Sequence, residues 1–498
     1  MTISNFSIGL DHQKPIDFYK CVEDEKQVKL SDEAIKAVEY CRSFLEREES
    51  KGNVHYGINT GFGHLCDVHI DDSSLGQLQE NLLLSHACGS GAYVPDEVAR
   101  TILLLKIKNL SLGHSGIRLQ LLNHLVQIYN SGAVPLIHEQ GSLGASGDLA
   151  PLAHMSLCLL GEGDIKYEDK IVPATEFLNK IGLEPLRMVS KEGLALINGT
   201  QFSTAYGLQA VVKGRKLLKL ANLCSALSIE AFNCRLSPYD PRVHKIRPHH
   251  GQKSVAAEIL EWLKGSGIDQ RPQNSVQDPY SFRCIPQVHG AVSDLIDRVD
   301  DVIETEINSV SDNPLIFPDD EVIISGGNFH AQPIAFSMDH LALGLCELGS
   351  ITERRIYQLI NGHRGLPVCL IKDAGINSGL MILQYSAAST VSLNKQLATP
   401  SSVDSIISSM GQEDHVSMAA NAAVKTYTIL NNTFTVLAME YYTAMQALSL
   451  RDYKDLSPSL QSLLQEYREI VPVLETDRNV SKDVERTKSY LQGMLKRF

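Results

Sequence analysis

Four long stretches of this 498-residue chain have no proline beyond their first turn and carry apolar residues at helical spacing. They span residues 203–234, 285–308, 333–361 and 416–450. In the first, Leu217, Leu220 and Cys224 follow the i, i+3, i+7 pattern of one helix face. Each stretch is much longer than the average globular helix of about 11–12 residues. Helices this long and apolar must bury more than one face, in a bundle or against another subunit.

Strand signals are short by comparison, at residues 165–172 and 322–324. No alternation of strands with helices is present, which disfavours a doubly wound sheet. Glycine turns are denser in the first two hundred residues than in the long-helix region. We therefore expect a mostly α fold with a loop-rich N-terminal domain (1–200), a central long-helix bundle (201–450) and a C-terminal helical tail (451–498).

Charge and composition narrow the classes of partner. Lys and Arg number 45 against 58 Asp and Glu, a net charge of −13, so a basic face for nucleic acid is not expected. No uninterrupted apolar run approaches the roughly 18 residues of a membrane span. The first twenty residues have no basic start followed by an apolar stretch, so we do not expect a secretory signal. Ten cysteines without a CxxC pair are typical of reduced thiols. We expect a cytoplasmic protein without a membrane or nucleic-acid partner.

Several common site motifs are incomplete. Gly61-Phe62-Gly63 does not extend to GxGxxG, because Cys66 takes the third glycine position, and no GxxxxGK[ST] follows elsewhere. No HExxH and no Cys/His cluster has zinc-ligand spacing, so we expect neither a nucleotide nor a metal. Asp148 replaces the last glycine of a GxSxG around Ser146, which makes a serine hydrolase a weak interpretation.

Residues 141–154 read GSLGASGDLAPLAH and have three glycines spaced by three. One interpretation is structural: Ser146 or Asp148 caps a helix that begins just downstream. The other is chemical. In a sharp bend the Gly147 nitrogen can approach the Ala145 carbonyl carbon, since glycine has no Cβ to obstruct it. Cyclisation with loss of water, followed by loss of the Ser146 hydroxyl, would leave a conjugated methylidene electrophile.

This segment resembles the prosthetic-group motif of the aromatic amino acid ammonia-lyases, whose 4-methylideneimidazol-5-one (MIO) forms from Ala-Ser-Gly. The resemblance extends from about Tyr56 to Arg451. It is carried by YGINTGFG (56–63), SHA (85–87), INGTQ (197–201), VQDPYSFR (276–283), SGGNFH (325–330) and GQEDHVS (411–417). It implies that Ala145, Ser146 and Gly147 become MIO, without metal or dissociable cofactor. It also implies the α-helical homotetramer of the fumarase/aspartase-like lyases.

The resemblance assigns roles to further residues. Tyr56 and Tyr280 are its two phenols, with Tyr56 at the position of the base for the substrate's β-proton. A phenol has a pKa near 10, so the site would have to lower it. Arg283 would bind the substrate carboxylate with its planar guanidinium group. The alternative is that Arg283 forms a surface ion pair. Asn198 and Gln277 would hydrogen-bond MIO or the carboxylate. Which phenol is the base, and whether the amine or the ring adds to the methylidene, stays open.

Substrate choice depends on a few positions in the same resemblance. Phe329 would lie beside the cofactor. His86 would meet the substrate ring, where a phenylalanine site would need an apolar residue. Glu413 is acidic where phenylalanine and tyrosine lyases carry an amide, and a carboxylate favours a protonated imidazole. Glu413 could instead compensate a helix N-terminus, and the adjacent Asp414 leaves open which carboxylate faces inward.

These residues favour the histidine-specific branch: elimination of ammonia from L-histidine to give trans-urocanate, the first step of histidine degradation. Two alternatives stay open. The same electrophile could serve a tyrosine ammonia-lyase or an aminomutase. A chain of another class would be a helical scaffold that kept the fold and lost the chemistry.

Overall fold

The computed structural model of the chain describes residues 5–51, 57–58, 60, 70–272, 275–451 and 454–497. They form two compact units, each assembled from three separate segments. Unit 1 comprises Met1–Val212, Asp300–Asp339 and Pro400–Val424, and unit 2 comprises Lys213–Val299, His340–Thr399 and Lys425–Phe498. The boundaries expected near residues 200 and 450 do not coincide with these units, because the four long helices each contribute residues to both.

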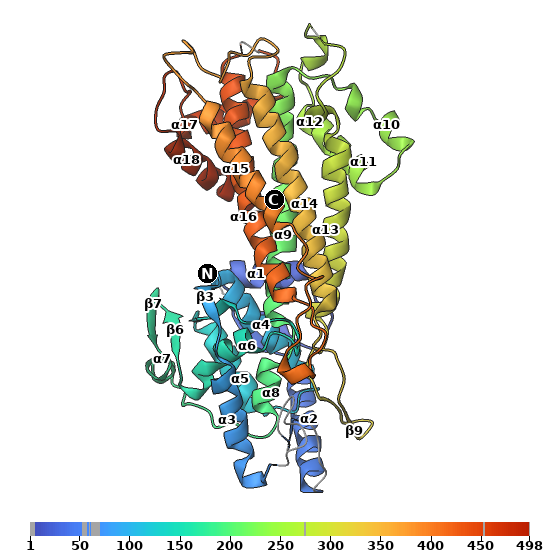
Figure 1. Cartoon of the computed structure of the whole chain (residues 1–498), viewed down its shortest axis with the longest axis vertical. Coiled ribbons are helices and arrows are strands. Elements are labelled where there is room, and N and C mark those ends of the chain that lie inside the picture. Colours follow the sequence, from blue (N-terminus) through green and yellow to red (C-terminus); the bar gives the residue numbers. More distant parts are fainter. Residues whose placement is uncertain are drawn as a thin grey trace. The chain divides into compact units, whose positions relative to one another are not determined.

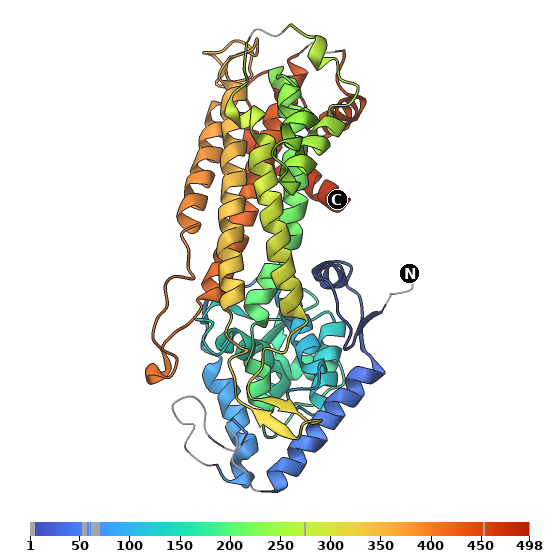
Figure 2. The same cartoon turned by 90° about the vertical axis from the view of Figure 1, so that its right-hand side faces the viewer.

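The four predicted long helices are confirmed. They are α9 (Gln201–Phe232), α13 (Ile285–Ile307), α14 (Gln332–Ile360) and α16 (Ala419–Ser449). Within unit 2 they run alongside one another (Figures 1 and 2). Buried polar contacts join them: Glu440 of α16 accepts from Ser228 of α9 at 2.8 Å and from Arg355 of α14 at 2.5 Å. Such paired burial is required because an unpaired charge in a helix core is costly.

Shorter helices complete unit 2. They are α10 (Pro241–Lys245), α11 (His250–Trp262), α12 (Tyr280–Arg283), α15 (Met381–Leu397), α17 (Pro458–Ile470) and α18 (Val480–Leu495), with 3₁₀ turns at Ser237–Tyr239 and Ile268–Gln270. The expected C-terminal helical tail is therefore two helices. Tyr467 and Thr487 share a hydrogen bond of 2.6 Å between them, and Tyr442 of α16 donates to Asp483 of α18 at 3.3 Å.

Unit 1 is more helical than its glycine turns suggested. Its helices are α1 (Pro15–Glu23), α2 (Asp32–Ser50), α3 (Leu75–His86), α4 (Asp96–Ser111), α5 (Leu119–Asn130), α6 (Leu149–Ser156), α7 (Ala174–Lys180) and α8 (Glu192–Ile197), with 3₁₀ turns at Asp72–Ser74, Leu157–Leu160 and Ser409–Gly411. Every residue of α4 from Thr101 to Ser111 is buried. A helix covered on all sides has no single apolar stripe, so periodicity does not reveal it.

The described strands are short and pair locally. β1 (Phe6–Ile8) is parallel to β2 (Val28–Leu30), β3 (Ser90–Tyr93) is antiparallel to β5 (His138–Gln140), β4 (Val134–Pro135), β6 (Asp164–Tyr167) and β7 (Lys170–Pro173) form one antiparallel sheet, and β8 (Leu315–Phe317) pairs antiparallel with β9 (Val322–Ile324). The strand expected at 322–324 is confirmed. The single strand expected at 165–172 is wrong: Glu168 and Asp169, with φ of +50° and +59°, turn it into a hairpin.

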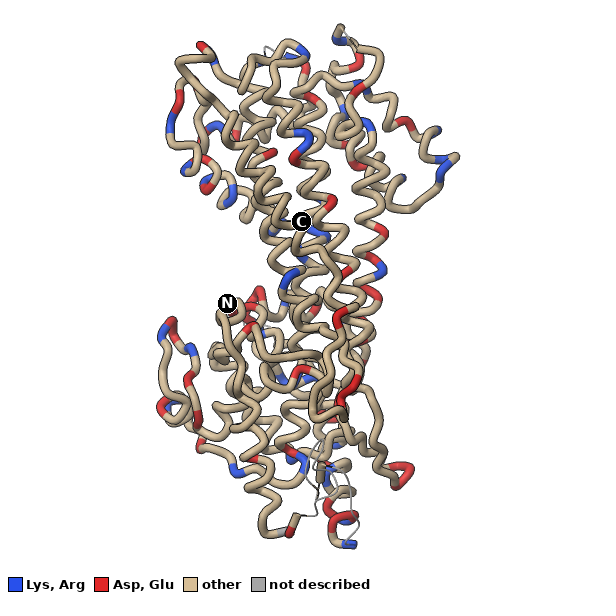
Figure 3. Tube along the Cα trace, viewed as in Figure 1, with Lys and Arg blue, Asp and Glu red and all other residues tan. Residues whose placement is uncertain are grey.

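Acidic and basic residues are mixed along the described chain. Figure 3 shows Lys and Arg interspersed with Asp and Glu along the described chain. Among the described helices, α14 is long and apolar enough to cross a membrane by length and composition, although 72% of its most apolar window is buried inside the structure. A search for uninterrupted apolar runs misses this helix because Asp339 and His340 interrupt it. Buried core helices pass the same test, so α14 is weak support for a membrane span.

Candidate active site

The 141–148 segment connects β5 to α6 by a tight bend. Gly144 and Gly147 have φ of +64° and +76°, the left-handed region that favours glycine. A Cβ at Gly147 would lie 2.2 Å from the carbonyl oxygen of Gly199, and one at Gly144 would lie 2.3 Å from Ser417 Oγ. Both glycines are thus required by conformation and by space. The segments of Gly199 and Ser417 therefore lie in close contact with the bend.

Asp148 is the N-cap residue of α6, but its carboxylate makes no capping bond in the described structure. It accepts instead from Ser142 Oγ at 2.9 Å, from Ser203 Oγ at 3.0 Å and from Ser203 N–H at 2.9 Å. Burial raises its pKa, and these hydrogen bonds oppose the rise. The side-chain capping interpretation of Asp148 is therefore wrong. The carboxylate ties the bend to the first turn of α9.

Glu413 faces the bend. Its Oε1 accepts from Ser146 Oγ at 2.7 Å and its Oε2 accepts from Ser408 Oγ at 2.8 Å. Asp414 is exposed, so the geometry decides which of the two carboxylates points toward Ser146. Ser146 therefore bonds to Glu413 rather than capping α6. Glu413 lies on the loop before α16, so helix-terminus compensation does not describe it either.

The loop of Glu413 packs along the bend for several residues. Met418 N–H donates to the Leu143 carbonyl at 2.8 Å, and Ser417 Oγ donates to the Gly144 carbonyl at 3.0 Å. Ala145 forms a small apolar cluster with Val416 and Met418. These contacts join segments about 270 residues apart, since Ser417 and Gly144 are 273 positions apart. The site geometry therefore depends on long-range packing.

His86 ends α3 and is half-buried. Ser85 Oγ lies 3.0 Å from its Nδ1. Burial lowers the pKa of His86, while the negative charge of Glu413 acts in the opposite direction with a smaller effect. The imidazole is therefore held neutral. A neutral ring has one donor and one acceptor nitrogen, which suits hydrogen bonding to a polar substrate ring.

Asn198 and Phe329, the two residues predicted to contact the cofactor, lie on loops that follow α8 and β9. Asn198 follows the last residue of α8 and is buried, and its Oδ1 has no hydrogen-bond partner among the described residues. Phe329 is half-buried on the loop after β9. The next residue, His330, stacks on His415 with ring centroids 5.7 Å apart. The loop of Phe329 is thereby joined to the loop of Glu413.

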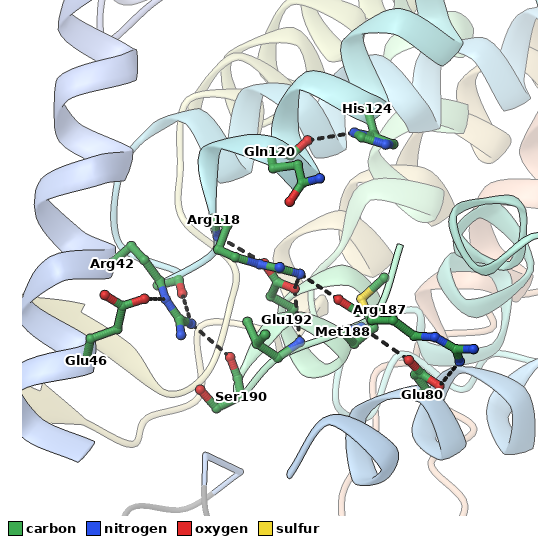
Figure 4. A network of polar contacts seen from close by, with 12 residues as sticks. Arg42, Glu46, Glu80, Arg118, Gln120, His124, Arg187, Met188, Ser190 and Glu192 are labelled. Atoms are coloured by element: carbon green, nitrogen blue, oxygen red, sulfur yellow. Dashed lines mark hydrogen bonds and ion pairs between the residues drawn. The ribbon is translucent and has the colours of Figure 1, made fainter. Parts of the chain in front are cut away.

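A polar network holds α8 and hence Asn198 (Figure 4). Glu192 is buried and accepts from the Arg118 guanidinium at 2.9 and 2.7 Å and from the Arg118 N–H at 3.0 Å. The adjacent Lys191 forms a fully buried ion pair of 2.7 Å with Asp312. Buried pairs of this kind fix geometry because breaking one leaves an uncompensated charge. Sequence reasoning missed them, since no local pattern joins positions so far apart.

Gln277, Tyr280 and Arg283 form a second group, within unit 2. Tyr280 begins α12 and is 70% exposed. The Arg283 guanidinium carbon lies 4.4 Å from the centroid of the Tyr280 ring. Arg283 makes no ion pair with a described residue, and its Nε is buried without a hydrogen-bond partner. The surface ion-pair interpretation of Arg283 is therefore wrong, and its donors stay available for an anion.

The loop that carries this group is anchored at several points. Asp278 is buried and pairs with Arg364 at 2.9 Å, and its other oxygen accepts from the Arg235 N–H at 2.8 Å. Tyr239 Oη donates to the Phe282 carbonyl at 2.6 Å. Sequence reasoning did not single out these anchors. Tyr56, the other predicted phenol, lies outside the described residues.

Comparisons with known proteins place this geometry in a family. The family model described as aromatic amino acid lyase matches residues 14–469. The chain belongs to the aromatic amino acid lyase family. It is 47% identical over 466 residues to the histidine ammonia-lyase of Geobacillus sp. strain WCH70, covering 93% of this chain and 92% of the relative. It is 46% identical over 467 residues to that of Vibrio cholerae, covering 93% and 91%.

Solved structures of this family share the fold. The histidine ammonia-lyase of Trypanosoma cruzi matches with a TM-score of 0.92 and 38% identity, covering 98% of this chain and 94% of that one. A tyrosine aminomutase of Streptomyces globisporus matches with a TM-score of 0.94 and 34% identity, covering 99% and 98%. The mostly α lyase fold expected from the sequence is confirmed. Because lyase and aminomutase match equally well, fold alone does not choose between their reactions.

Proposed function

We propose that this lyase is a histidine ammonia-lyase, which converts L-histidine to trans-urocanate and ammonia. One observation carries the proposal: the Glu413 carboxylate, and not Asp414, accepts from Ser146 Oγ at 2.7 Å. The negative charge of Glu413 also acts to raise the pKa of His86, against the larger effect of burial. A polar ring can bind between an imidazole and a carboxylate, whereas a phenyl ring would leave both unpaired. The curated relatives named histidine ammonia-lyase support the same substrate.

The residues around the bend fit MIO as the prosthetic group. Gly147 has no room for a Cβ beside Gly199, and the buried Asn198 Oδ1 lacks a partner among the described residues. MIO has no N–H or O–H group, so Asn198 would bind it through the NH2 donor of the same side-chain amide, directed at the ring carbonyl oxygen. Ala145, Ser146 and Gly147 would supply the ring atoms themselves. Once formed, MIO supplies the electron sink that makes an amine a good leaving group.

The chain's own residues bind the substrate and move its protons. The family resemblance implies that Arg283 binds the substrate carboxylate, and its buried Nε, which has no hydrogen-bond partner among the described residues, is free to do so. His86 and Glu413 orient the imidazole ring. Tyr56 or Tyr280 takes the β-proton.

Separate incubations with histidine, tyrosine and phenylalanine test this function. We expect urocanate and ammonia from histidine. The absorbance of urocanate, a conjugated acid, measures its formation. Coumarate or β-tyrosine accumulating in place of urocanate would contradict the histidine assignment and favour the tyrosine lyase or aminomutase. No product from any of the three, together with an unmodified 141–154 peptide, would favour a non-catalytic scaffold.

We further propose that the chain forms a homotetramer through an apolar face of α15. Ile382, Tyr385 and Leu393 recur along one face of this helix and are 57%, 59% and 46% exposed, so they form an apolar stripe, whereas an apolar side chain exposed singly is ordinary. The double substitution Ile382→Asp with Tyr385→Asp should therefore reduce the molar mass measured by light scattering after gel filtration. Ile171→Asp, at a 60% exposed position of β7, is the control and should leave the mass unchanged. A tetrameric double variant would contradict this interface.

A cytoplasmic location is also part of the proposal. Nine described cysteines are free thiols: Cys21, Cys41, Cys88, Cys158, Cys224, Cys234, Cys284, Cys346 and Cys369. Reduced thiols suit a compartment that keeps cysteine reduced.

A further inference from the structure

Two lysines of α4, Lys106 and Lys108, are buried. Lys106 Nζ donates to the carbonyl oxygen of Ala195 at 3.1 Å and to that of Asn198 at 2.7 Å. These carbonyls lie at the C-terminal end of α8, where carbonyl groups lack partners within the helix. A lysine at a helix C-terminus satisfies them and complements the helix dipole. Lys106 thus anchors the chain where α8 ends.

The Asn198 carbonyl that Lys106 binds belongs to the peptide before Gly199, and Gly199 contacts the 141–148 bend. The Gly199 carbonyl accepts from the Asp148 N–H at 2.7 Å, and Gly147 and Gly199 pair as an isolated bridge. Gly199 has a φ of +121°, a conformation in which glycine has little steric restraint of its own. The orientation of the Gly199 peptide must therefore be set from outside. Lys106 restrains the peptide before Gly199 through the Asn198 carbonyl, and Ser311 Oγ accepts at 3.3 Å from the Thr200 N–H of the peptide after it.

We propose that Lys106 is a positioning residue for the Ala145-Ser146-Gly147 segment, because it holds the Gly199 peptide against which Gly147 closes. This inference rests on the proposed function, to which the cyclisation belongs. Ring closure joins the Gly147 nitrogen to the Ala145 carbonyl carbon. The carbonyl oxygen leaves as water with the amide hydrogens of Gly147 and Ser146. The Ser146 hydroxyl leaves as a second water with its α-hydrogen, so no oxidant is needed.

The proposed role does not depend on the charge of Lys106. Burial lowers the pKa of Lys106 to about 7, with Asp312 and Asp148 acting to raise it and Lys191 to lower it further. Both the ammonium and the neutral amine carry enough hydrogens for two carbonyl acceptors. The bond to Asn198 is therefore kept in either state.

Lys108 provides a matched control on the same helix. Its Nζ donates to two backbone carbonyls as well, those of Gly9 at 2.7 Å and Asp11 at 3.0 Å. Lys106→Met and Lys108→Met each remove one buried amine and leave two carbonyls without their donor. They differ in position: one carbonyl bound by Lys106 is next to Gly199, which contacts the bend, whereas those bound by Lys108 are at Gly9 and Asp11. A general loss of stability should affect both variants alike.

The test follows loss of two waters from the 141–154 peptide by mass spectrometry, in soluble folded protein sampled at successive times. We expect Lys106→Met to mature at least about tenfold more slowly than the parent, and Lys108→Met to mature at the parent's rate. Equal maturation rates in the two variants, at similar melting temperatures, overturn the proposal.

If Lys106→Met gives no soluble chain, Lys106→Gln replaces it, since its shorter amide cannot hold both carbonyls as lysine does. Slower maturation of Lys106→Gln then supports the proposal, and a parent-like rate overturns it. A parent chain that never loses the two waters contradicts the proposed function itself, so the two failures are distinguishable.

Discussion

Replacing Ser146 with alanine should lower histidine turnover by about a thousandfold or more, the scale on which loss of a group that forms the reactive centre acts. Alanine has no hydroxyl to leave as water, so the methylidene cannot form. The side chain makes a single described hydrogen bond, to Glu413 at 2.7 Å, so folding should survive. Turnover, the peptide mass and the thermal melting curve measure the three expectations separately.

A matched control for Ser146→Ala is Ser408→Ala. Ser408 Oγ donates to the other oxygen of Glu413 at 2.8 Å but lies outside the 141–148 bend. Its loss should leave the two-water mass deficit of the 141–154 peptide in place. Substantial turnover by Ser146→Ala would show that the reactive centre has been misassigned. A missing mass deficit in Ser408→Ala would show instead that the Glu413 loop, and not the serine hydroxyl, controls maturation.

Replacing Glu413 with glutamine should lower kcat/KM for histidine by about 10- to 100-fold while maturation continues. Glutamine is close in shape, and its oxygen can still accept from Ser146, so the bend should stay intact. The variant loses the negative charge that favours the protonated form of the substrate's imidazole ring. Steady-state kinetics with histidine and tyrosine should therefore show histidine turnover falling more than tyrosine turnover.

Asp414→Asn removes the same charge one residue later and is the control. Asp414 is exposed, and the described hydrogen bond of Ser146 goes to Glu413, so histidine kinetics should stay near those of the parent. Equal losses of activity in the two variants would indicate a general electrostatic effect. A fall in melting temperature that parallels the fall in activity of Glu413→Gln would assign Glu413 a structural role in place of a substrate-binding one.

Local patterns were sufficient for the elements that depend on neighbouring residues. The four long helices, of 23 to 32 residues, follow from apolar spacing, which the α-helix period converts directly into a buried face. They were less informative where burial is complete or a turn is short. The all-round burial of α4 gives no stripe, and the turn at Glu168 and Asp169 divides what resembled one strand.

The sequence alone determined the helical class, the Ala145-Ser146-Gly147 motif and, through resemblance, the family, because each is written in contiguous residues. Three contacts follow from long-range packing alone: Glu413 and not Asp414 faces Ser146, Asp148 binds Ser203 rather than capping α6, and Lys106 binds the Asn198 carbonyl. Each of these contacts joins residues 55 to 267 positions apart. Which polar groups meet across such separations depends on how whole elements pack and on where buried donors must find acceptors.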